Sequence, residues 1–435
     1  MSTVPNITST DSAQDILRPG EWLPSNIAHL AHWLSAIEKQ AACKHAEAVE
    51  LHPAIARFKA AIESDAEIYM LFHLMFDQVP RKPPYDKTPN MKPQVRDYQQ
   101  MLLLMNHILT HGPEFLLIDG EPAGLIGFPI NAILDWPMGT AAGFAAFVHP
   151  VVNKHMAEVL NAWGKFLSSP ESTSVLNKEA TGWFGPAAQK ALPDFVESFE
   201  CDPDKPHYGY TSWDDFFTRK FRDGIRPVIS PQDDSVINNA CESKRYKLAR
   251  NVKKFDKFWL KTQPYSLFHM LDGDSRVDEF CGGTVYQAYL SALAYHRWHS
   301  PVNGRIVSSR IVDGTYYSEA YNQGFANDGK PDDSGPNNSQ GYLTSVATRA
   351  LIFIESDNPE IGLMCFIAVG MAEVSTCEIT VVDGQAIKKG EELGMFHFGG
   401  STHCLIFRKN VSLDFVDCSH EEGNLPVNAA LARLN

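Results

Sequence analysis

The chain carries a serine directly after two glycines, in the segment Gly399-Gly400-Ser401-Thr402. Glycines permit backbone conformations that other residues avoid, and they let another group approach the peptide closely. A serine hydroxyl in this position could therefore attack the carbonyl group of the residue before it. A Gly-Gly-Ser triplet by itself is typical of an ordinary turn, so this motif needs support from other residues.

Two histidines three residues apart form a second group that could do chemistry. His296 and His299 lie within residues 295–304, which read YHRWHSPVNG. An imidazole can act as a general base or a proton donor near neutral pH, and it can also bind a metal. A pair of hydrogen-bonded structural histidines is the alternative. The spacing is not that of the HExxH zinc motif and no other residues complete a ligand set, so we expect no bound metal.

The first half of the chain, which must support these residues, has the apolar spacing of helices. Apolar residues recur every three or four positions over 27–37, 68–76, 95–109 and 156–167. Ser64 and Glu67 predict a capping box before the second stretch, and Gly112 with Pro113 predicts the end of the third. We interpret these stripes as packing faces rather than as sites.

From about residue 205 onward, the apolar pattern changes to the period of two that is typical of strands. Strand-like runs cover 284–290, 305–311, 349–354, 365–369, 378–382, 394–398 and 404–407. The sequence therefore predicts an α+β protein with an extension over 1–44, a helical domain over 45–185 and a β-rich domain over 205–435. The polar stretch 324–341 is either a mobile connection or an active-site lid, and its lack of an apolar anchor favours the mobile connection.

The composition excludes several classes of protein. The 435 residues are 44% hydrophobic and 21% charged, which suits a globular protein with a large core. Thirty-eight Lys and Arg against 52 Asp and Glu give a net charge of −14, which opposes binding to nucleic acid or to an anionic membrane. We recognise no secretory signal, no membrane-spanning stretch and no CxxC spacing among the eight cysteines. We therefore expect reduced thiols in a cytoplasmic protein without a stable membrane anchor.

Several blocks of the second half resemble, in order, the pyruvoyl-dependent phosphatidylserine decarboxylase family. The resemblance extends from about residue 208 to the C-terminus. The blocks are 215–220 (DFFTRK) with Arg226-Pro227, 265–267 (YSL), Gly282-Gly283, 295–301 (YHRWHSP) and 394–402 (GMFHFGGST). The helical region of about 45–185 is similar to the associated domain of a soluble fungal branch whose members include tryptophan decarboxylases. The resemblance implies that the β-rich domain is catalytic and is a barrel-sandwich hybrid.

This resemblance implies a proenzyme that cuts its own chain. The hydroxyl of Ser401 would attack the Gly400 carbonyl, with His299 as the base, to form an ester. Elimination would then free the Gly400 carboxylate and leave a dehydroalanine at position 401, which would take up water and release ammonia to give a pyruvoyl group. Backbone donors would stabilise the oxyanion. The fragments 1–400 and 401–435 would stay associated through their strands.

The resemblance also implies a second stage, in which an amine substrate reacts with the new ketone. The pyruvoyl group would accept the electrons released as carbon dioxide leaves. His296 or His299 would then donate a proton to the product. His397 and His403 flank the cut and are weaker candidates, because residues in strands often only pack.

The sequence departs from the family pattern at one position. The family has an aspartate that orients the base histidine, and that aspartate falls on Cys241 within residues 238–243 (NNACES). We prefer Glu242 as the residue that orients His299, because a carboxylate fixes an imidazole tautomer better than a neutral thiol does. The substitution argues against unchanged phospholipid chemistry.

We expect the substrate to be a free aromatic L-amino acid, with tryptophan first and phenylalanine or tyrosine as further possibilities. The chain has no basic amphipathic patch that would bring it onto an anionic bilayer, and its helical region resembles the amino-acid branch. Decarboxylation of phosphatidylserine is the alternative.

Two rival classes have weaker support. Pyridoxal phosphate would need a Schiff-base lysine and a phosphate cradle in an α/β fold, which the β-rich second half does not fit, so we expect no such cofactor. The hairpin at residues 383–394 resembles those of biotinyl and lipoyl carriers, with Lys388 or Lys389 at the turn. A structural hairpin is the simpler interpretation.

Overall fold

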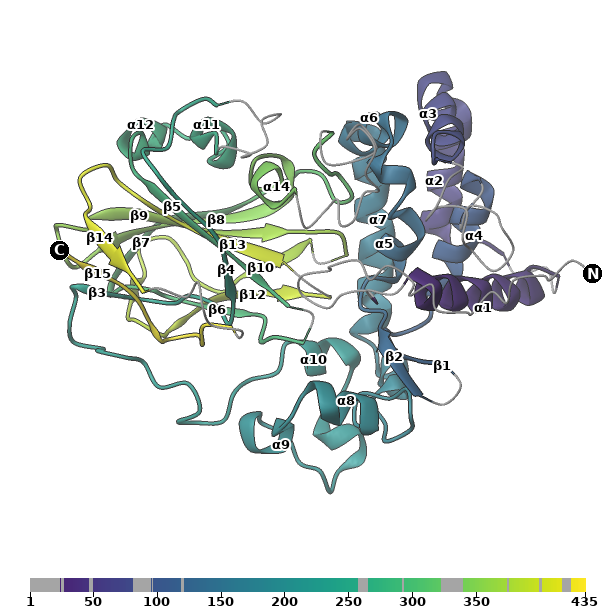
Figure 1. Ribbon diagram of the computed structural model, residues 1–435, viewed down its shortest axis with the longest axis horizontal. Helices are drawn as coiled ribbons and strands as arrows, with labels where there is room; N and C mark the ends of the chain where they lie inside the picture. The colour runs from purple at the N-terminus through teal and green to yellow at the C-terminus, as the bar shows by residue number, and fades with distance from the viewer. Residues whose placement is uncertain are drawn as a thin grey trace, which may run out of the picture.

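The computed structural model describes residues 24, 27–46, 50–80, 95, 97–118, 121–256, 265–291, 293–321, 339–373, 375–398, 401–416 and 424–435. A helical half and a β-rich half lie side by side (Figure 1). The predicted α+β class is therefore confirmed. Within the predicted 1–44 extension, residues 27–44 lie in a helix, whereas 1–23, 25 and 26 lie outside the described residues. Residues 324–338 of the polar stretch also lie outside them, and 340–341 begin a helix.

The helices occur mainly before residue 218, in agreement with the apolar spacing. They are α1 (Ile27–Ala46), α2 (Pro53–Ser64), α3 (Ala66–Asp77), α4 (Tyr98–Ile108), α5 (Pro129–Leu134), α6 (Ala141–Val148), α7 (Pro150–Leu167), α8 (Pro186–Ala191), α9 (Phe195–Ser198), α10 (Trp213–Phe217), α11 (Leu267–Met270), α12 (Val277–Phe280) and α14 (Gln340–Val346), with 3₁₀ turns η1 (Pro137–Gly139), η2 (Pro170–Val175) and η3 (Pro206–Gly209).

The start of α3 corrects one expectation. Ser64 is the last residue of α2, and the side chain of Asp65 accepts hydrogen bonds from the backbone N–H groups of Glu67 and Ile68. The predicted capping box of Ser64 and Glu67 was wrong. A carboxylate one residue further along, at an extended backbone position, satisfies the free N–H groups and also favours the positive end of the helix dipole.

The strands are β1 (Phe115–Ile118), β2 (Glu121–Leu125), β3 (Val236–Asn238), β4 (Lys244–Arg250), β5 (Thr284–Leu290), β6 (Arg297–His299), β7 (Gly304–Val312), β8 (Arg349–Ser356), β9 (Leu363–Gly370), β10 (Thr376–Ile379), β11 (Ala386–Ile387), β12 (Glu392–His397), β13 (Ser401–Phe407), β14 (Leu413–Phe415) and β15 (Ala430–Leu434). The run predicted at 284–290 coincides with β5, whereas β10 lies earlier than its prediction. The hairpin of β1 and β2, inside the helical half, was not predicted.

A seven-stranded sheet in the order β11-β7-β8-β9-β13-β5-β4 forms the centre of the β-rich half. Every residue of β9 is buried, because both faces of the sheet are covered. The helices α11, α12 and α14 lie over one face and the sheet β10-β12-β6 lies over the other (Figure 1). The ring of Trp298 on β6 packs 5.6 Å from that of Phe366 on β9, so the two sheets form a sandwich.

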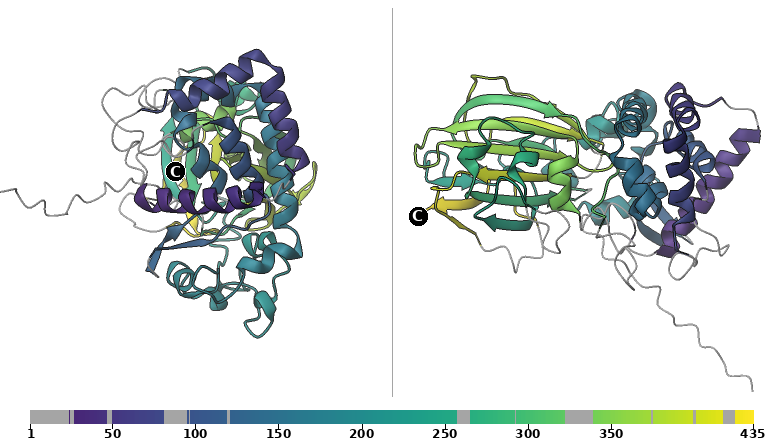
Figure 2. Two further views of the ribbon diagram at one scale, coloured as in Figure 1. Left: turned by 90° about the vertical axis from the view of Figure 1, so that its right-hand side faces the viewer. Right: turned by 90° about the horizontal axis from the view of Figure 1, so that it is seen from above.

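The helical half closes one end of this sandwich. Helices α5, α6 and α7 lie against the end where β12 stops and β13 begins, while α1 to α4 lie further out (Figures 1 and 2). Contacts cross the boundary: the rings of Phe147 and Tyr317 lie 6.2 Å apart, and the Asn153 side chain accepts a hydrogen bond from the Tyr316 backbone. The predicted reactive serine therefore lies at the meeting point of the two halves.

Candidate active site

Ser401 is the first residue of β13, in the interior of the seven-stranded sheet. Its Cα partners are Leu290 on β5 and Gly370 on β9. Gly400 and the Ser401 side chain lie outside what the structure describes.

His299 ends β6, and its ring has two defined hydrogen bonds. Nδ1 lies 2.7 Å from the Gly390 carbonyl oxygen, and Nε2 lies 2.9 Å from the Tyr295 hydroxyl. A carbonyl can only accept, so Nδ1 carries the proton and Nε2 accepts from Tyr295. Burial lowers the pKa of His299. The ring is therefore a neutral imidazole with its lone pair on Nε2, which is the form that a general base needs.

His296 lies nearer than His299 to Ser401 along the strands. Its carbonyl accepts a hydrogen bond from the Phe396 N–H, whereas the Cα partner of His299 is Glu392. The His296 ring is buried and stacks on Phe217 at 4.0 Å. Burial lowers the pKa of His296 well below its ordinary value, and the charge of Arg219 lowers it further. This ring is therefore neutral at neutral pH.

Glu242 does not make the contact that we expected of it. Its carboxylate forms a two-pronged ion pair with Arg226, at 2.8 and 3.0 Å, and accepts a hydrogen bond from the Val427 N–H. Among the described residues, both nitrogens of the His299 ring are paired with Gly390 and Tyr295 instead. The expectation that Glu242 orients His299 is therefore corrected, because Arg226 holds the carboxylate and a backbone carbonyl fixes the tautomer.

Cys241 stands beside His299 through the backbone. The His299 N–H donates to the carbonyl of Ala240, the residue before the cysteine. Cys241 is fully buried, and burial raises the pKa of its thiol well above the ordinary value. A neutral thiol at this position cannot supply the negative charge that an aspartate would.

The block at residues 215–220 positions the segment that carries both histidines. The guanidinium of Arg219 is 4% exposed and donates to the carbonyls of Leu293 and Ala294. Burial lowers the pKa of Arg219 to about 10, which still leaves it charged at neutral pH. The carbonyl of Thr218 accepts a hydrogen bond from Arg297 at 2.7 Å. The loop before β6 is thus tied to α10 by charge-assisted hydrogen bonds.

His397, three residues before Gly400, belongs to a charged cluster. Nδ1 lies 3.0 Å from both carboxylate oxygens of Asp214 on α10, and Nε2 lies 2.9 Å from Glu378 on β10. Burial lowers the pKa of His397, but the two carboxylates outweigh this effect and the pKa is raised. His403, by contrast, is fully buried near Phe366, and burial lowers its pKa to about 3. His403 is a packing residue.

Comparison with known proteins assigns this arrangement to a family. A family model described as phosphatidylserine decarboxylase matches residues 213–430, half of the chain, and this range contains Ser401, His296, His299 and the partners of the two histidines. The chain belongs to the phosphatidylserine decarboxylase family. A second family model, also described as phosphatidylserine decarboxylase, matches residues 52–192 in the helical half.

Relatives in the phosphatidylserine decarboxylase family share different amounts of the chain. Decarboxylase iboD of Amanita muscaria is 40% identical over 348 residues, which are 76% of this chain and 99% of that protein. An L-tryptophan decarboxylase of Psilocybe cubensis is 37% identical over 399 residues, 87% of this chain and 86% of that protein. A phosphatidylserine decarboxylase proenzyme of Fusobacterium nucleatum is 28% identical over 251 residues, 54% of this chain and 75% of that protein.

A pocket of about 550 Å³ lies beside Tyr295, in the segment that carries His296 and His299. Its lining includes Phe199, Phe221, Tyr289, Tyr295, Arg226 and Glu242. Two features connect it to the predicted chemistry. Tyr295 donates to His299, and Tyr289 precedes Leu290, the Cα partner of Ser401. The pocket combines aromatic walls with charged side chains, as a site for an amphipathic small molecule requires.

Sequence reasoning missed three of the groups that shape this site. Tyr295 lies in the block 295–301, but the sequence did not predict its contact with His299. The Gly390 carbonyl is a backbone group, so no residue type in the sequence points to it. Asp214 was passed over in favour of its neighbour Asp215, which instead accepts hydrogen bonds from Thr211. Only the folded register brings Asp214 to His397.

The described residues give no support to the other classes of site. No group of three or more His, Cys, Asp or Glu side chains there could hold a metal ion, and no helix there is long and apolar enough to cross a membrane. Six cysteines are free thiols, namely Cys201, Cys241, Cys281, Cys365, Cys377 and Cys404. Lys389 is 5% exposed and donates to the Ser230 and Asp233 carbonyls, so it is a structural residue, whereas Lys388 is exposed.

Proposed function

We propose that this protein is a pyruvoyl-dependent decarboxylase of free aromatic L-amino acids, which converts L-tryptophan to tryptamine and carbon dioxide. The observation that carries the proposal is the extent of similarity. The Psilocybe cubensis L-tryptophan decarboxylase matches across both halves, over 87% of this chain, whereas the Fusobacterium nucleatum phosphatidylserine decarboxylase proenzyme matches over 54%. The aromatic and charged lining of the pocket near His299 suits an aromatic amino acid.

Self-cleavage at Gly400-Ser401 begins with the hydroxyl of Ser401. The Oγ–carbon bond to the Gly400 carbonyl forms, the amide C–N bond breaks, and the hydroxyl proton passes through a base to the nitrogen. His299 remains our candidate for that base, because its Nδ1–H bond to Gly390 leaves Nε2 unprotonated. His296 is the second candidate, since the strand register brings it beside Phe396.

The residues around position 401 fit a pyruvoyl group at a new chain terminus. Residues 401–407 have a Cα partner on both β5 and β9 at every position, so the fragment that begins at 401 would remain in the sheet after cleavage. When formed, the pyruvoyl group would supply the carbonyl that binds the substrate amine and the electron sink for decarboxylation. The two fragments therefore act as one enzyme.

The chain must also supply a proton to the product. In the uncut chain the His296 ring is neutral and is affected by the charge of Arg219. A substrate carboxylate that enters nearby would offset this charge and raise the pKa of the imidazole. We therefore keep His296 and His299 as the candidate proton donors and propose no such role for the buried His403.

Replacement of Ser401 with alanine tests the central step. The variant lacks the attacking oxygen, so we expect one uncut chain with the wild-type fold and no decarboxylase activity. Denaturing mass spectrometry would detect fragments 1–400 and 401–435 in wild type only. Ser412→Ala, an exposed serine in the same fragment, should be cut and active. Decarboxylation by the Ser401→Ala protein would refute the proposal.

The same preparations separate the two substrates. Wild-type protein incubated with L-tryptophan should release tryptamine, and incubated with phosphatidylserine vesicles it should form little phosphatidylethanolamine. Turnover of the lipid alone would favour the alternative function, phosphatidylserine decarboxylation.

A further inference from the structure

Phe398 has an unusual backbone conformation. It is the third residue before Ser401 and has φ of +74°. A bulky side chain is rarely found in this left-handed region, because its Cβ crowds the backbone, and such strain persists only where the surroundings enforce it. The strained residue directly precedes the two glycines of the cleavage motif.

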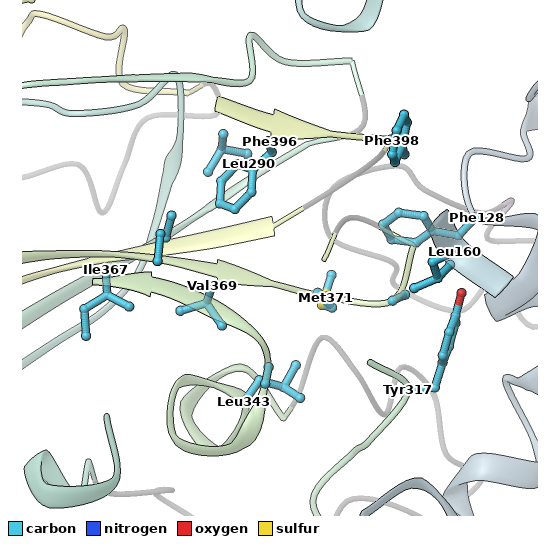
Figure 3. Packing of buried hydrophobic residues seen from close by; sticks show 14 of the residues in the cluster. Phe128, Leu160, Leu290, Tyr317, Leu343, Ile367, Val369, Met371, Phe396 and Phe398 are labelled. Carbon is cyan, nitrogen blue, oxygen red and sulfur yellow. The ribbon is translucent and has the colours of Figure 1, made fainter. Parts of the chain in front are cut away.

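The ring of Phe398 is held by the helical half. Phe398 is 6% exposed and lies just past the end of β12, on the side of the sandwich where Phe128 and Leu160 lie (Figure 3). It lies against Gly164 of α7, where an added Cβ would come within 2.7 Å of ring atom Cε2 and 2.8 Å of Cζ. Glycine lowers the stability of a helix interior, and the close approach of this ring explains its presence in α7.

The preceding residue is fixed from another direction. His397 is tied to Asp214 on α10 and to Glu378 on β10. The end of β12 therefore has two consecutive anchors outside its own strand, one charged and one aromatic. Together they restrict the backbone that leads into the cleavage motif.

We propose that the contact between Phe398 and Gly164 holds the chain before Ser401 in its strained conformation and so accelerates self-cleavage. The inference rests on the proposed function and adds positioning residues to it. The reaction that these residues favour is the shift of the Gly400 acyl group from nitrogen to the Ser401 oxygen, which exchanges one C–N bond for one C–O bond and needs no further reactant. Cleavage then releases the strain, because residue 400 becomes a free end.

Gly164→Ala tests the proposal. The new methyl group would displace the Phe398 ring, so we expect cleavage to slow by about tenfold or more, while alanine favours the helix itself. Cleavage would be followed by denaturing mass spectrometry during cell-free synthesis, and folding by circular dichroism. Lys165→Ala, an exposed neighbour on α7, is the control and should cleave within twofold of wild type.

A second pair of variants distinguishes an effect on the backbone before Ser401 from a general loss of structure. Phe398→Ala should also slow cleavage, and Phe398→Leu in the Gly164→Ala background should restore part of the rate, because the smaller side chain makes room for the methyl group. Turnover of tryptophan per cleaved chain should change much less than the cleavage rate. Equal losses in both quantities, or no rescue by leucine, would overturn the proposal.

The outcome also distinguishes this inference from the proposed function. A wild-type chain that stays whole and active would remove the basis of both. A wild-type chain that cleaves normally, together with a folded Gly164→Ala variant that cleaves within twofold of it, would overturn only the role of the contact. If Gly164→Ala does not fold, the rate of Phe398→Ala decides the question in the same way.

Discussion

At the scale of single residues, the His299 ring is held in one tautomer by partners that, among the described residues, are not carboxylates. The Gly390 carbonyl fixes the proton on Nδ1, and the Tyr295 hydroxyl donates to Nε2. A carbonyl sets the tautomer but adds no full negative charge. Burial lowers the pKa of His299, and this effect outweighs the Gly390 hydrogen bond and the charge of Glu392, which both raise the pKa. A cysteine at position 241, in place of an aspartate, is compatible with a His299 ring that stays neutral.

Tyr295→Phe tests this arrangement. The tyrosine hydroxyl stabilises neutral imidazole, so its loss should raise the pKa of His299. If His299 is the base, the acidic side of the pH–rate profile of cleavage should shift to higher pH by about 0.5–1 unit. This shift corresponds to the free energy of about one hydrogen bond. Tyr208→Phe, whose ring stacks on Phe184 elsewhere, is the control. A limb that stays in place or moves to lower pH would contradict the assignment.

At the scale of elements, α10 is the part of the chain that organises the catalytic end of the sandwich. Its residues and those just after it contact two segments that are distant in sequence, residues 293–296 and the end of β12. Phe217 stacks on His296, Arg219 binds the loop carbonyls at 293 and 294, and Asp214 binds His397. A short helix can do this because its residues at positions three and four apart share a face. The DFFTRK block thus has a structural explanation.

Asp214→Asn tests the charged part of this arrangement through pH. The pKa of His397 is raised in the folded protein, so its stabilisation is complete below the ordinary histidine pKa and is lost as pH rises through the folded value. We expect the variant to lose about 1.5–3 kcal/mol of stability at pH 6 and less at pH 9. Urea unfolding at both values would measure this loss. An equal loss of stability at pH 6 and pH 9 would contradict the prediction. Asp223→Asn, at an exposed residue, is the control and should lose stability at neither pH.

At the scale of the whole molecule, the two halves meet through buried polar contacts as well as aromatic rings. Glu373 in the β-rich half is fully buried, and its carboxyl accepts hydrogen bonds from the backbone of Ile130 and Asn131 in the helical half, at 2.6 and 2.8 Å. Burial raises the pKa of Glu373 to about 8. The interface therefore contains a protonated carboxyl group at neutral pH, three residues after the strand partner of Ser401.

Glu373→Gln should remove the loss of folding stability that Glu373 causes at high pH. Because the folded pKa lies above the ordinary value, the stability linked to Glu373 is complete below about pH 4.5 and is lost as pH rises through 8. Glutamine keeps the acceptor oxygen without this loss, so the variant should match wild type at pH 5 and exceed it by about 3 kcal/mol at pH 9. Thermal or urea unfolding would measure both. A variant less stable than wild type at pH 9 would contradict this, and exposed Glu360→Gln is the control.

Much of the fold followed from local patterns in the sequence. The apolar spacing at 156–167 lies within α7, and the alternating run at 284–290 is β5, because both patterns reflect burial on one face of a regular element. The family resemblance likewise followed from ordered blocks. Local competition was harder to resolve: Asp65 rather than Ser64 caps α3, since neighbouring polar side chains can satisfy the same N–H groups.

The sequence by itself determined the α+β class, the order of the two halves and the identity of the reactive serine and histidines as candidates. Only the tertiary structure decided which groups touch them. The Glu242 carboxylate pairs with Arg226. The His299 ring forms hydrogen bonds with Tyr295 and Gly390, and the Phe398 ring packs against Gly164, on a helix more than 200 residues earlier. Periodicity reports which face of an element is buried, but partners distant in sequence are chosen by strand register and by packing between domains.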